Sequence, residues 1–246
     1  MAQIWLYSLV SVAIVSLISL VGLITLGVRQ ERLQKVLSYV VSFSAGALLG
    51  DVFIHILPEI MVEGNALSTS VYILAGIVLF FVLERFLLWH HSHTGHNESI
   101  HSMTYLTVFG DALHNFLDGM AIAASFLISV PVGIATTVAV MLHEIPQEIG
   151  QFAVLVHGGW SRKKALIYNF LSALTAVLGA VVVLLFTQGT EQPLALLAIG
   201  AASFIYVAMS DLIPELHKET SPKKSLIQLF WMIIGIGVMA LMLLLE

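Results

Sequence analysis

The sequence contains no cysteine and few charged residues. Only 10% of its 246 residues are Asp, Glu, Lys or Arg and 59% are apolar, whereas a soluble domain has about 25% charged and roughly 45–50% apolar residues. A soluble fold would expose much of this apolar surface to water, so the composition excludes a cytosolic enzyme, a nucleic-acid-binding protein and a disordered chain. The absence of cysteine excludes disulfides and thiolate metal sites, which leaves imidazole, carboxylate and amide groups as metal ligands.

Long apolar runs recur along the whole chain. About 20 apolar residues cross the hydrocarbon core of a bilayer as a helix, because a helix pairs its backbone polar groups internally. The fourth and fifth runs are joined only by a tight turn at 129–131, which predicts a helical hairpin. We predict one all-α integral membrane domain over residues 1–246, with eight transmembrane helices (3+2+3) at about residues 4–28, 36–58, 68–89, 103–129, 132–157, 162–187, 193–216 and 225–245.

Basic residues occur only at the odd-numbered connections between these helices. The positive-inside rule places such connections in the cytoplasm, so both termini are expected to be extracytoplasmic. No cleavage site follows the first run, which we interpret as a true span. The short loops leave no room for a soluble domain and suit a cell membrane protein. The ten basic residues are Arg29, Arg32, Lys35, Arg85, Arg162, Lys163, Lys164, Lys218, Lys223 and Lys224.

The longest polar stretch is a histidine-rich segment, which we predict to be a short cytoplasmic loop at 90–102. Five histidines fall within the twelve residues 90–101. Such a segment can chelate a transition metal weakly, or it can be a solvated, disordered loop. The sequence does not separate these two interpretations.

Ionisable residues gather in the fourth and fifth spans, where burying a charge costs several kcal/mol. His114 and Asp118 lie four residues apart on one helical face, as do His143 and Gln147. The hairpin brings the middles of both spans to similar depth, so these groups can face one another. Mixed imidazole, carboxylate and amide ligands suit a divalent first-row cation. One polar residue in a span would indicate helix packing, but these two spans carry eight: Asp111, His114, Asn115, Asp118, His143, Glu144, Gln147 and Glu148.

A proline interrupts this polar part of the fifth span. Pro146 has no backbone N–H, and its ring clashes with the carbonyl of Leu142. We expect the freed carbonyl and a kink to belong to irregular backbone that lines a polar cavity.

Four segments resemble the ZIP family of metal transporters, most closely its LIV-1 branch. They are HNFLDG (114–119), HEIPQE (143–148), GALLGDVFIHILPE (46–59) and FIYVAMSDLIPEL (204–216). The resemblance implies eight spans with both termini outside, a homodimer in the lipid bilayer, and sliding of helices 1, 4, 5 and 6 against the other four. It implies no prosthetic group. The substrate would be Zn²⁺ or a related divalent cation such as Fe²⁺, Mn²⁺ or Cd²⁺.

The resemblance also implies two facing metal sites between the fourth and fifth spans. Asp118 and Gln147 would bridge them, and Glu148 would lie in the pathway or just behind the ligands. The first, transport site is matched by His114, Asp118, His143 and Gln147. The second is matched by Asn115, Asp118, Glu144 and Gln147.

Three positions depart from the pattern of the family. Many LIV-1 members have a histidine where this chain has Gln147, and a neutral amide is a weaker ligand. Some relatives supply a carboxylate from the sixth span near Thr175, so the second site would be weak or regulatory here. Gln151 replaces an aspartate that is common after the fifth-span motif, which removes a negative charge from the pathway.

The second and seventh spans carry further polar residues and end alike in Pro-Glu. This ending indicates that the first and last three spans are repeats, although the sequence does not show whether they are inverted. Asp51, His55 and Asp211 would line the ends of a cation pathway, or they would lock helices together as buried polar groups. We expect Asp111 to lie in the pathway or just behind the ligands.

The leading hypothesis is a transporter that imports Zn²⁺ into the cytoplasm. One alternative is an intramembrane zinc protease or hydrolase, because HEIPQ (143–147) nearly matches His-Glu-x-x-His and 117–119 resembles a distal ligand motif. The motif of a zinc protease needs a second histidine at position 147, where this chain has Gln. Another alternative is a metal sensor, although no signalling domain is attached.

Overall fold

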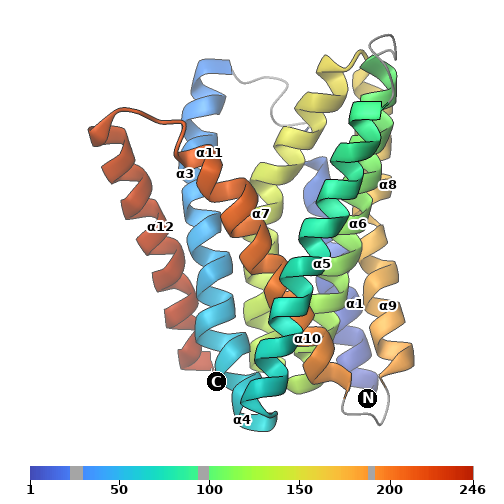
Figure 1. Ribbon diagram of the computed structural model, residues 1–246, viewed down its shortest axis with the longest axis vertical. Coiled ribbons are helices and arrows are strands. Elements are labelled where there is room, and N and C mark those ends of the chain that lie inside the picture. The colour runs from blue at the N-terminus through green and yellow to red at the C-terminus, as the bar shows by residue number, and fades with distance from the viewer. Residues whose placement is uncertain (23–29, 94–99, 188–191, 246) are drawn as a thin grey trace.

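The computed structural model describes residues 1–22, 30–93, 100–187 and 192–245, and the regular structure within these ranges is entirely helical. Eight helical rods follow one another along these ranges (Figure 1). They are α1 (Ala2–Ile18) with η1 (Ser19–Val21); α3 (Gln30–Gly50), η2 (Asp51–Ile56) and α4 (Leu57–Glu63); α5 (Ala66–His93); α6 (Ile100–Ile128); α7 (Val130–His157); α8 (Arg162–Ala173) and α9 (Thr175–Phe186); α10 (Gln192–Val207), η3 (Ala208–Leu212) and α11 (Ile213–Leu216); and α12 (Pro222–Met242) with η4 (Leu243–Leu245).

The eight rods coincide with the eight predicted spans, which confirms the all-helical prediction. Within the described ranges, six rods are long and apolar enough to cross a membrane. The other two are α6 and α7, which carry the ionisable side chains of the predicted cation site. The question for these two helices is therefore why they carry polar residues within predicted membrane spans.

Two sequence predictions extend beyond the described residues. The end of the first predicted span, 23–28, lies outside them. In the histidine-rich segment, α5 continues to His93 and α6 begins at Ile100, so helix occupies both ends of the predicted loop. Residues 94–99 between the two helices lie outside the described ranges.

Consecutive rods run in opposite directions, and both chain termini lie at the same end of the bundle (Figure 1). The second rod (α3–η2–α4) and the seventh (α10–η3–α11) also run in opposite directions. Each contains a π-helical segment followed directly by a turn that includes Pro58 or Pro214. A proline ring clashes with the carbonyl four residues earlier, and the wider π turn accommodates it. The repeated Pro-Glu endings are thus inverted relative to each other.

Glycine residues allow two pairs of rods to touch backbone to backbone. A Cβ atom added at Gly119 of α6 would lie 1.9 Å from the carbonyl oxygen of Ala176 in α9. A Cβ atom at Gly179 of α9 would lie 1.9 Å from the carbonyl oxygen of Phe116 in α6. Gly46 of α3 and Gly235 of α12 make the corresponding contacts, at 2.1 Å each. These glycines set the separation of α6 from α9 and of α3 from α12.

We predict that Gly179→Val destabilises the protein strongly, because its side chain would overlap the α6 backbone. Overpacking of this kind costs about 1–3 kcal/mol or more. Gly237→Val is the matched control, since no atom lies within 4 Å of a Cβ at Gly237. Thermal unfolding of the detergent-solubilised protein, followed by size-exclusion chromatography, should show a lower midpoint for the first variant alone. Equal midpoints for the two variants would contradict the close α6–α9 contact.

Candidate metal centre

A short turn aligns the polar residues of α6 and α7. Ser129 separates the two helices and caps α7, its hydroxyl accepting a hydrogen bond of 3.3 Å from the backbone N–H of Val132. His114 of α6 and Glu144 of α7 each lie fifteen residues from Ser129. Because the helices are antiparallel and rise equally per residue, these side chains are at the same depth.

Four side chains from the two helices converge on one point. The Nε2 atoms of His114 and His143 are 3.2 Å apart. Oδ2 of Asp118 lies 3.4 Å from Nε2 of His114 and 3.2 Å from Nε2 of His143. Oε1 of Glu144 lies 3.5 Å and 3.4 Å from the same two nitrogens. All four atoms lie within 4.8 Å of one another.

These separations match the edges of a metal coordination shell. A tetrahedral Zn²⁺ ion with ligands at about 2.0–2.2 Å requires ligand atoms roughly 3.3–3.6 Å apart. The five nitrogen–nitrogen and nitrogen–oxygen distances of 3.2–3.5 Å agree with that requirement. The residues present therefore fit a divalent cation. We refer to His114, Asp118, His143 and Glu144 as the HDHE cluster.

The orientation of His143 suits a ligand. Its Nδ1 lies 3.3 Å from the carbonyl oxygen of Ala139, one turn earlier in α7. Donation to this carbonyl places the proton on Nδ1 and leaves the Nε2 lone pair directed at the cluster. Apart from the histidine contacts, both oxygens of Asp118 and Oε1 of Glu144 have no hydrogen-bond donor in the described part of the chain. Buried carboxylate oxygens without donors indicate a site for a positive ion.

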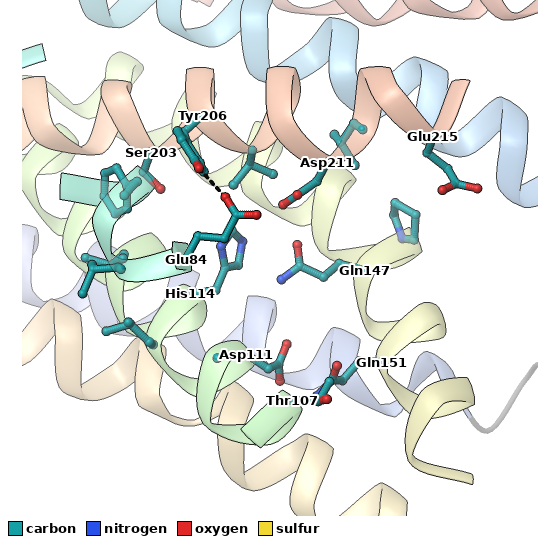
Figure 2. Close-up of a pocket in the computed structure, with 18 of the residues that line it drawn as sticks. Glu84, Thr107, Asp111, His114, Gln147, Gln151, Ser203, Tyr206, Asp211 and Glu215 are labelled. Carbon is teal, nitrogen blue, oxygen red and sulfur yellow. Dashed lines mark hydrogen bonds between the residues drawn. The ribbon is translucent and has the colours of Figure 1, made fainter. Parts of the chain in front are cut away.

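The cluster lies beside a cavity of about 450 Å³ between α5, α6, α7 and the seventh rod (Figure 2). Its four members differ in exposure: His143 and Asp118 are fully buried, whereas the His114 side chain is 16% exposed and lines the cavity. His114 therefore connects the buried ligands with the open space. Three other candidate site residues line the same cavity, namely Asp111, Gln147 and Asp211, and Gln151 lines it as well.

The remaining predicted residues lie outside this cavity. Asn115 is fully buried next to the cluster and donates through Nδ2 to the carbonyl oxygen of Asp111 at 3.1 Å, while its Oδ1 has no donor among the described residues. Glu148 is buried and accepts a hydrogen bond from Asn169 of α8.

Asp51 and His55 belong to η2 and do not line the cavity. The hydroxyl of Thr136 lies 3.4 Å from Oδ1 of Asp51. Nε2 of His55 donates to the carbonyl oxygen of Met239 at 2.8 Å, which ties η2 to α12. For His55, the structure shows the helix-locking contact that the sequence left as one of two interpretations.

Pro146 lines the cavity as expected, but the carbonyl that it leaves free does not. The Leu142 carbonyl left free by Pro146 accepts a hydrogen bond of 2.5 Å from Ser44 of α3, so it does not face the cavity. The Thr175 hydroxyl lies 2.5 Å from the carbonyl oxygen of Ala112 and 2.6 Å from that of Ser172. Thr175, the first residue of α9, thus binds backbone carbonyls of α6 and α8.

Four residues near the site were missed by sequence reasoning. Tyr206 of α10 donates a hydrogen bond to Glu84 of α5, and both line the cavity (Figure 2). Asn169 and Ser172 of α8 contact the carboxylates of Glu148 and Asp111. Asn169 and Ser172 stand three residues apart on one helix face, a spacing that could have indicated them.

Together, the rods and the buried cluster define a multi-span helical membrane protein with an interior site that fits a metal ion. Comparison with known proteins narrows this class. The sequence profile described as ZIP zinc transporter matches residues 2–103 and 89–243. The chain belongs to the ZIP zinc transporter family, whose members are transporters and not enzymes.

Several relatives show how much of the chain is shared. Zinc transporter ZIP13 of Pongo abelii is 35% identical over 222 residues, covering 83% of this chain and 66% of its own length. Zinc transporter SLC39A7 of Mus musculus is 27% identical over 337 residues, covering 99% of this chain and 70% of its own length. Zinc transporter foi of Drosophila melanogaster is 37% identical over 152 residues, 61% of this chain and 21% of its own length. The resemblance to the LIV-1 branch is confirmed.

We predict that the purified protein binds Zn²⁺ through the HDHE cluster. His143→Ala should weaken binding by more than the roughly 10–100-fold loss that follows removal of a group behind the ligands, because it removes a ligand itself. The matched control is His217→Ala, since His217 is an exposed histidine just after α11. Isothermal titration calorimetry of both variants measures the difference. Unchanged affinity in His143→Ala would show that zinc binds elsewhere.

Proposed function

We propose that this chain carries a divalent cation, Zn²⁺ in the first place, across the cell membrane into the cytoplasm. The observation that carries the proposal is the HDHE cluster, whose atoms have the spacing of a zinc coordination shell and which reaches a cavity through His114. Membership of the ZIP family supports zinc as the substrate. The whole chain, 1–246, would act as a single transporter domain.

In this proposal all eight rods cross the bilayer and both termini are extracytoplasmic. The basic residues at 162–164 and 218–224 lie at the end of the bundle opposite the termini (Figure 1). Lysine and arginine near span ends favour the cytoplasm. The cavity extends from Leu117 and His114 toward this basic end, where Glu215 of α11 lines it. The site would therefore face the cytoplasm in this conformation.

The ligands suit an ion that must also leave. Imidazole and carboxylate groups bind divalent first-row cations. The site has no thiolate, which would hold zinc more strongly, so the bound ion can also be released. His114, Asp118 and His143, with Glu144, would form the transport site, and the Gln147 amide in the same cavity would complete it. Asn115 would take part in a second site with Asp118, Glu144 and Gln147, supported by the unpaired Oδ1 of Asn115. Fe²⁺, Mn²⁺ and Cd²⁺ accept the same types of ligand.

The close glycine contacts support movement of two rigid groups of helices. Gly119 and Gly179 join α6 to α9, which both belong to the group that would slide. Gly46 and Gly235 join α3 to α12, which both belong to the other group. We propose that the rods of α1, α6, α7 and α8–α9 slide against the other four. We further propose that the protein is a homodimer in the membrane and that the segment at 90–102 is cytoplasmic.

Proteoliposomes containing the protein should take up Zn²⁺ in a saturable manner, and this uptake should collapse in His143→Ala. His217→Ala should transport as the wild type does, since His217 lies away from the cavity. Parallel assays with Fe²⁺, Mn²⁺ and Cd²⁺ give the selectivity. If correctly inserted, folded protein moved none of these metals, the transporter proposal would be wrong.

Acidification should slow uptake. A protonated imidazole cannot bind a metal, so protons compete with the cation for His114 and His143. Histidine ordinarily changes its charge between about pH 5 and 8. With the metal gradient held fixed, initial uptake rates should fall as the pH is lowered from about 7.5 to 5.5. A flat profile would argue against imidazole ligation in the rate-limiting step.

A further inference from the structure

Two buried carboxylates lie beside the HDHE cluster without belonging to it. Asp111 is 7% exposed and Glu148 is 1% exposed. Asp111 precedes Asn115 by one helical turn in α6, and Glu148 follows Glu144 by one turn in α7. Because the helices are antiparallel, both carboxylates are displaced from the cluster toward the basic end of the bundle.

Helix α8 supplies the polar partners of both carboxylates. The hydroxyl of Ser172 lies 2.5 Å from Oδ2 of Asp111 and 2.9 Å from the carbonyl oxygen of Asn169. The amide nitrogen of Asn169 donates to Oε2 of Glu148 and to the carbonyl oxygen of Ser19, the latter at 3.2 Å. One polar stripe of α8 thus contacts Asp111 on α6 and Glu148 on α7.

The orientation of the Asn169 amide is fixed and leaves its oxygen without a partner. Both of its contacts are with acceptors, so exchanging nitrogen and oxygen would place the amide oxygen against two other oxygens. Asn169 is fully buried, yet its Oδ1 has no hydrogen-bond donor among the described residues. The same is true of Oε1 of Glu148, whose other oxygen accepts from Asn169. Asn169 and Glu148 are hydrogen-bonded to each other, and each has one buried oxygen without a donor. Such a pair of oxygens indicates a binding place for a positive ion.

The charges around the cluster lead to the same conclusion. Asp111, Asp118, Glu144 and Glu148 are all buried. In the part of the chain that the structure describes, no lysine or arginine forms an ion pair or hydrogen bond with any of them. One divalent cation in the cluster offsets Asp118 and Glu144 only. Two further buried carboxyl groups would remain, and each would be stabilised by a second cation or by a proton.

We propose that Asp111, Glu148 and Asn169, with the hydroxyl of Ser172, form an additional cation site, which we call the α8 oxygen site. It rests on the proposed transport function, because the cavity lined by Asp111 gives the ion its access. It shares no residue with the two metal sites that the family resemblance implies.

The chemistry of the α8 oxygen site differs from that of the HDHE cluster. Its ligands are carboxylate, amide and hydroxyl oxygens, which favour hard divalent cations such as Mn²⁺, whereas imidazole favours Zn²⁺. An ion leaving the cluster toward the basic end would meet these oxygens one helical turn later. The site would thus hold a divalent cation between the cluster and the cytoplasmic side.

Binding of Mn²⁺ to the full-length protein tests this site. The detergent-solubilised chain is first loaded with one equivalent of Zn²⁺ and then titrated with Mn²⁺, and free Mn²⁺ is followed by its electron paramagnetic resonance signal. The wild type should bind one Mn²⁺ per chain at the α8 oxygen site, apart from any that enters the second site with Asn115. Glu148→Gln, which preserves the bond from Asn169, should weaken this binding about tenfold or more. Asp111→Asn should do the same, so the test remains if one variant does not fold.

The matched control is Glu219→Gln, which removes a carboxylate that pairs with Lys224 at the surface. It should bind Mn²⁺ as the wild type does. Absence of bound Mn²⁺ in the wild type, or equal binding by Glu148→Gln, Asp111→Asn and the control, would overturn the α8 oxygen site. Zinc binding and uptake compared between the wild type and His143→Ala report on the HDHE cluster separately, so failure of one site can be distinguished from failure of the other.

Discussion

The free-energy cost of burying carboxylates away from water determines how the interior of this protein is built. Asp118 and Glu144 are buried against two imidazoles, and Asp111 and Glu148 lie behind them. An isolated carboxylate at such depth is expensive, and truncation of one partner in a buried pair costs more than the pair itself contributes. Positive charge, from protons or from a bound cation, therefore stabilises this interior. The proposed function assigns that charge to a divalent cation.

The surrounding helices hold these charges in place by close backbone packing and not by bulky side chains. Glycine on both partners brings α6 against α9 and α3 against α12. The hydroxyl of Ser16 in α1 donates to the carbonyl oxygen of Ala173 at 2.8 Å, and this contact fixes α8 where it can reach the carboxylates. Apolar association is weak between helices in lipid, so such contacts carry much of the specificity. The glycine contacts of α6 with α9 thus help to fix the helix that carries His114 and Asp118 of the HDHE cluster.

Much of this arrangement could be predicted from the sequence because its signals are local. Hydropathy located the eight rods, and the predicted turn at 129–131 places His114 and Asp118 opposite His143. The fourth member of the cluster is Glu144, whereas Gln147 was predicted there. What could not be predicted depends on contacts between distant segments. The bond from Asn169 to Glu148 and the bond from Tyr206 to Glu84 need the packed helices. Likewise, a histidine bound to a neighbouring backbone carbonyl looks the same in sequence as one that faces a pore.

Pro146 converts an internal hydrogen bond of α7 into a bond between helices. The carbonyl of Leu142, which any other residue at position 146 could pair within the helix, is instead paired by Ser44 of α3. Movement of α7 along α3 would break that bond and leave the carbonyl unpaired away from water, at about 1–3 kcal/mol. The proline next to the metal ligands thus gives the helix a preferred resting register. In the proposed sliding motion, this bond would have to break before the site changes its depth in the membrane.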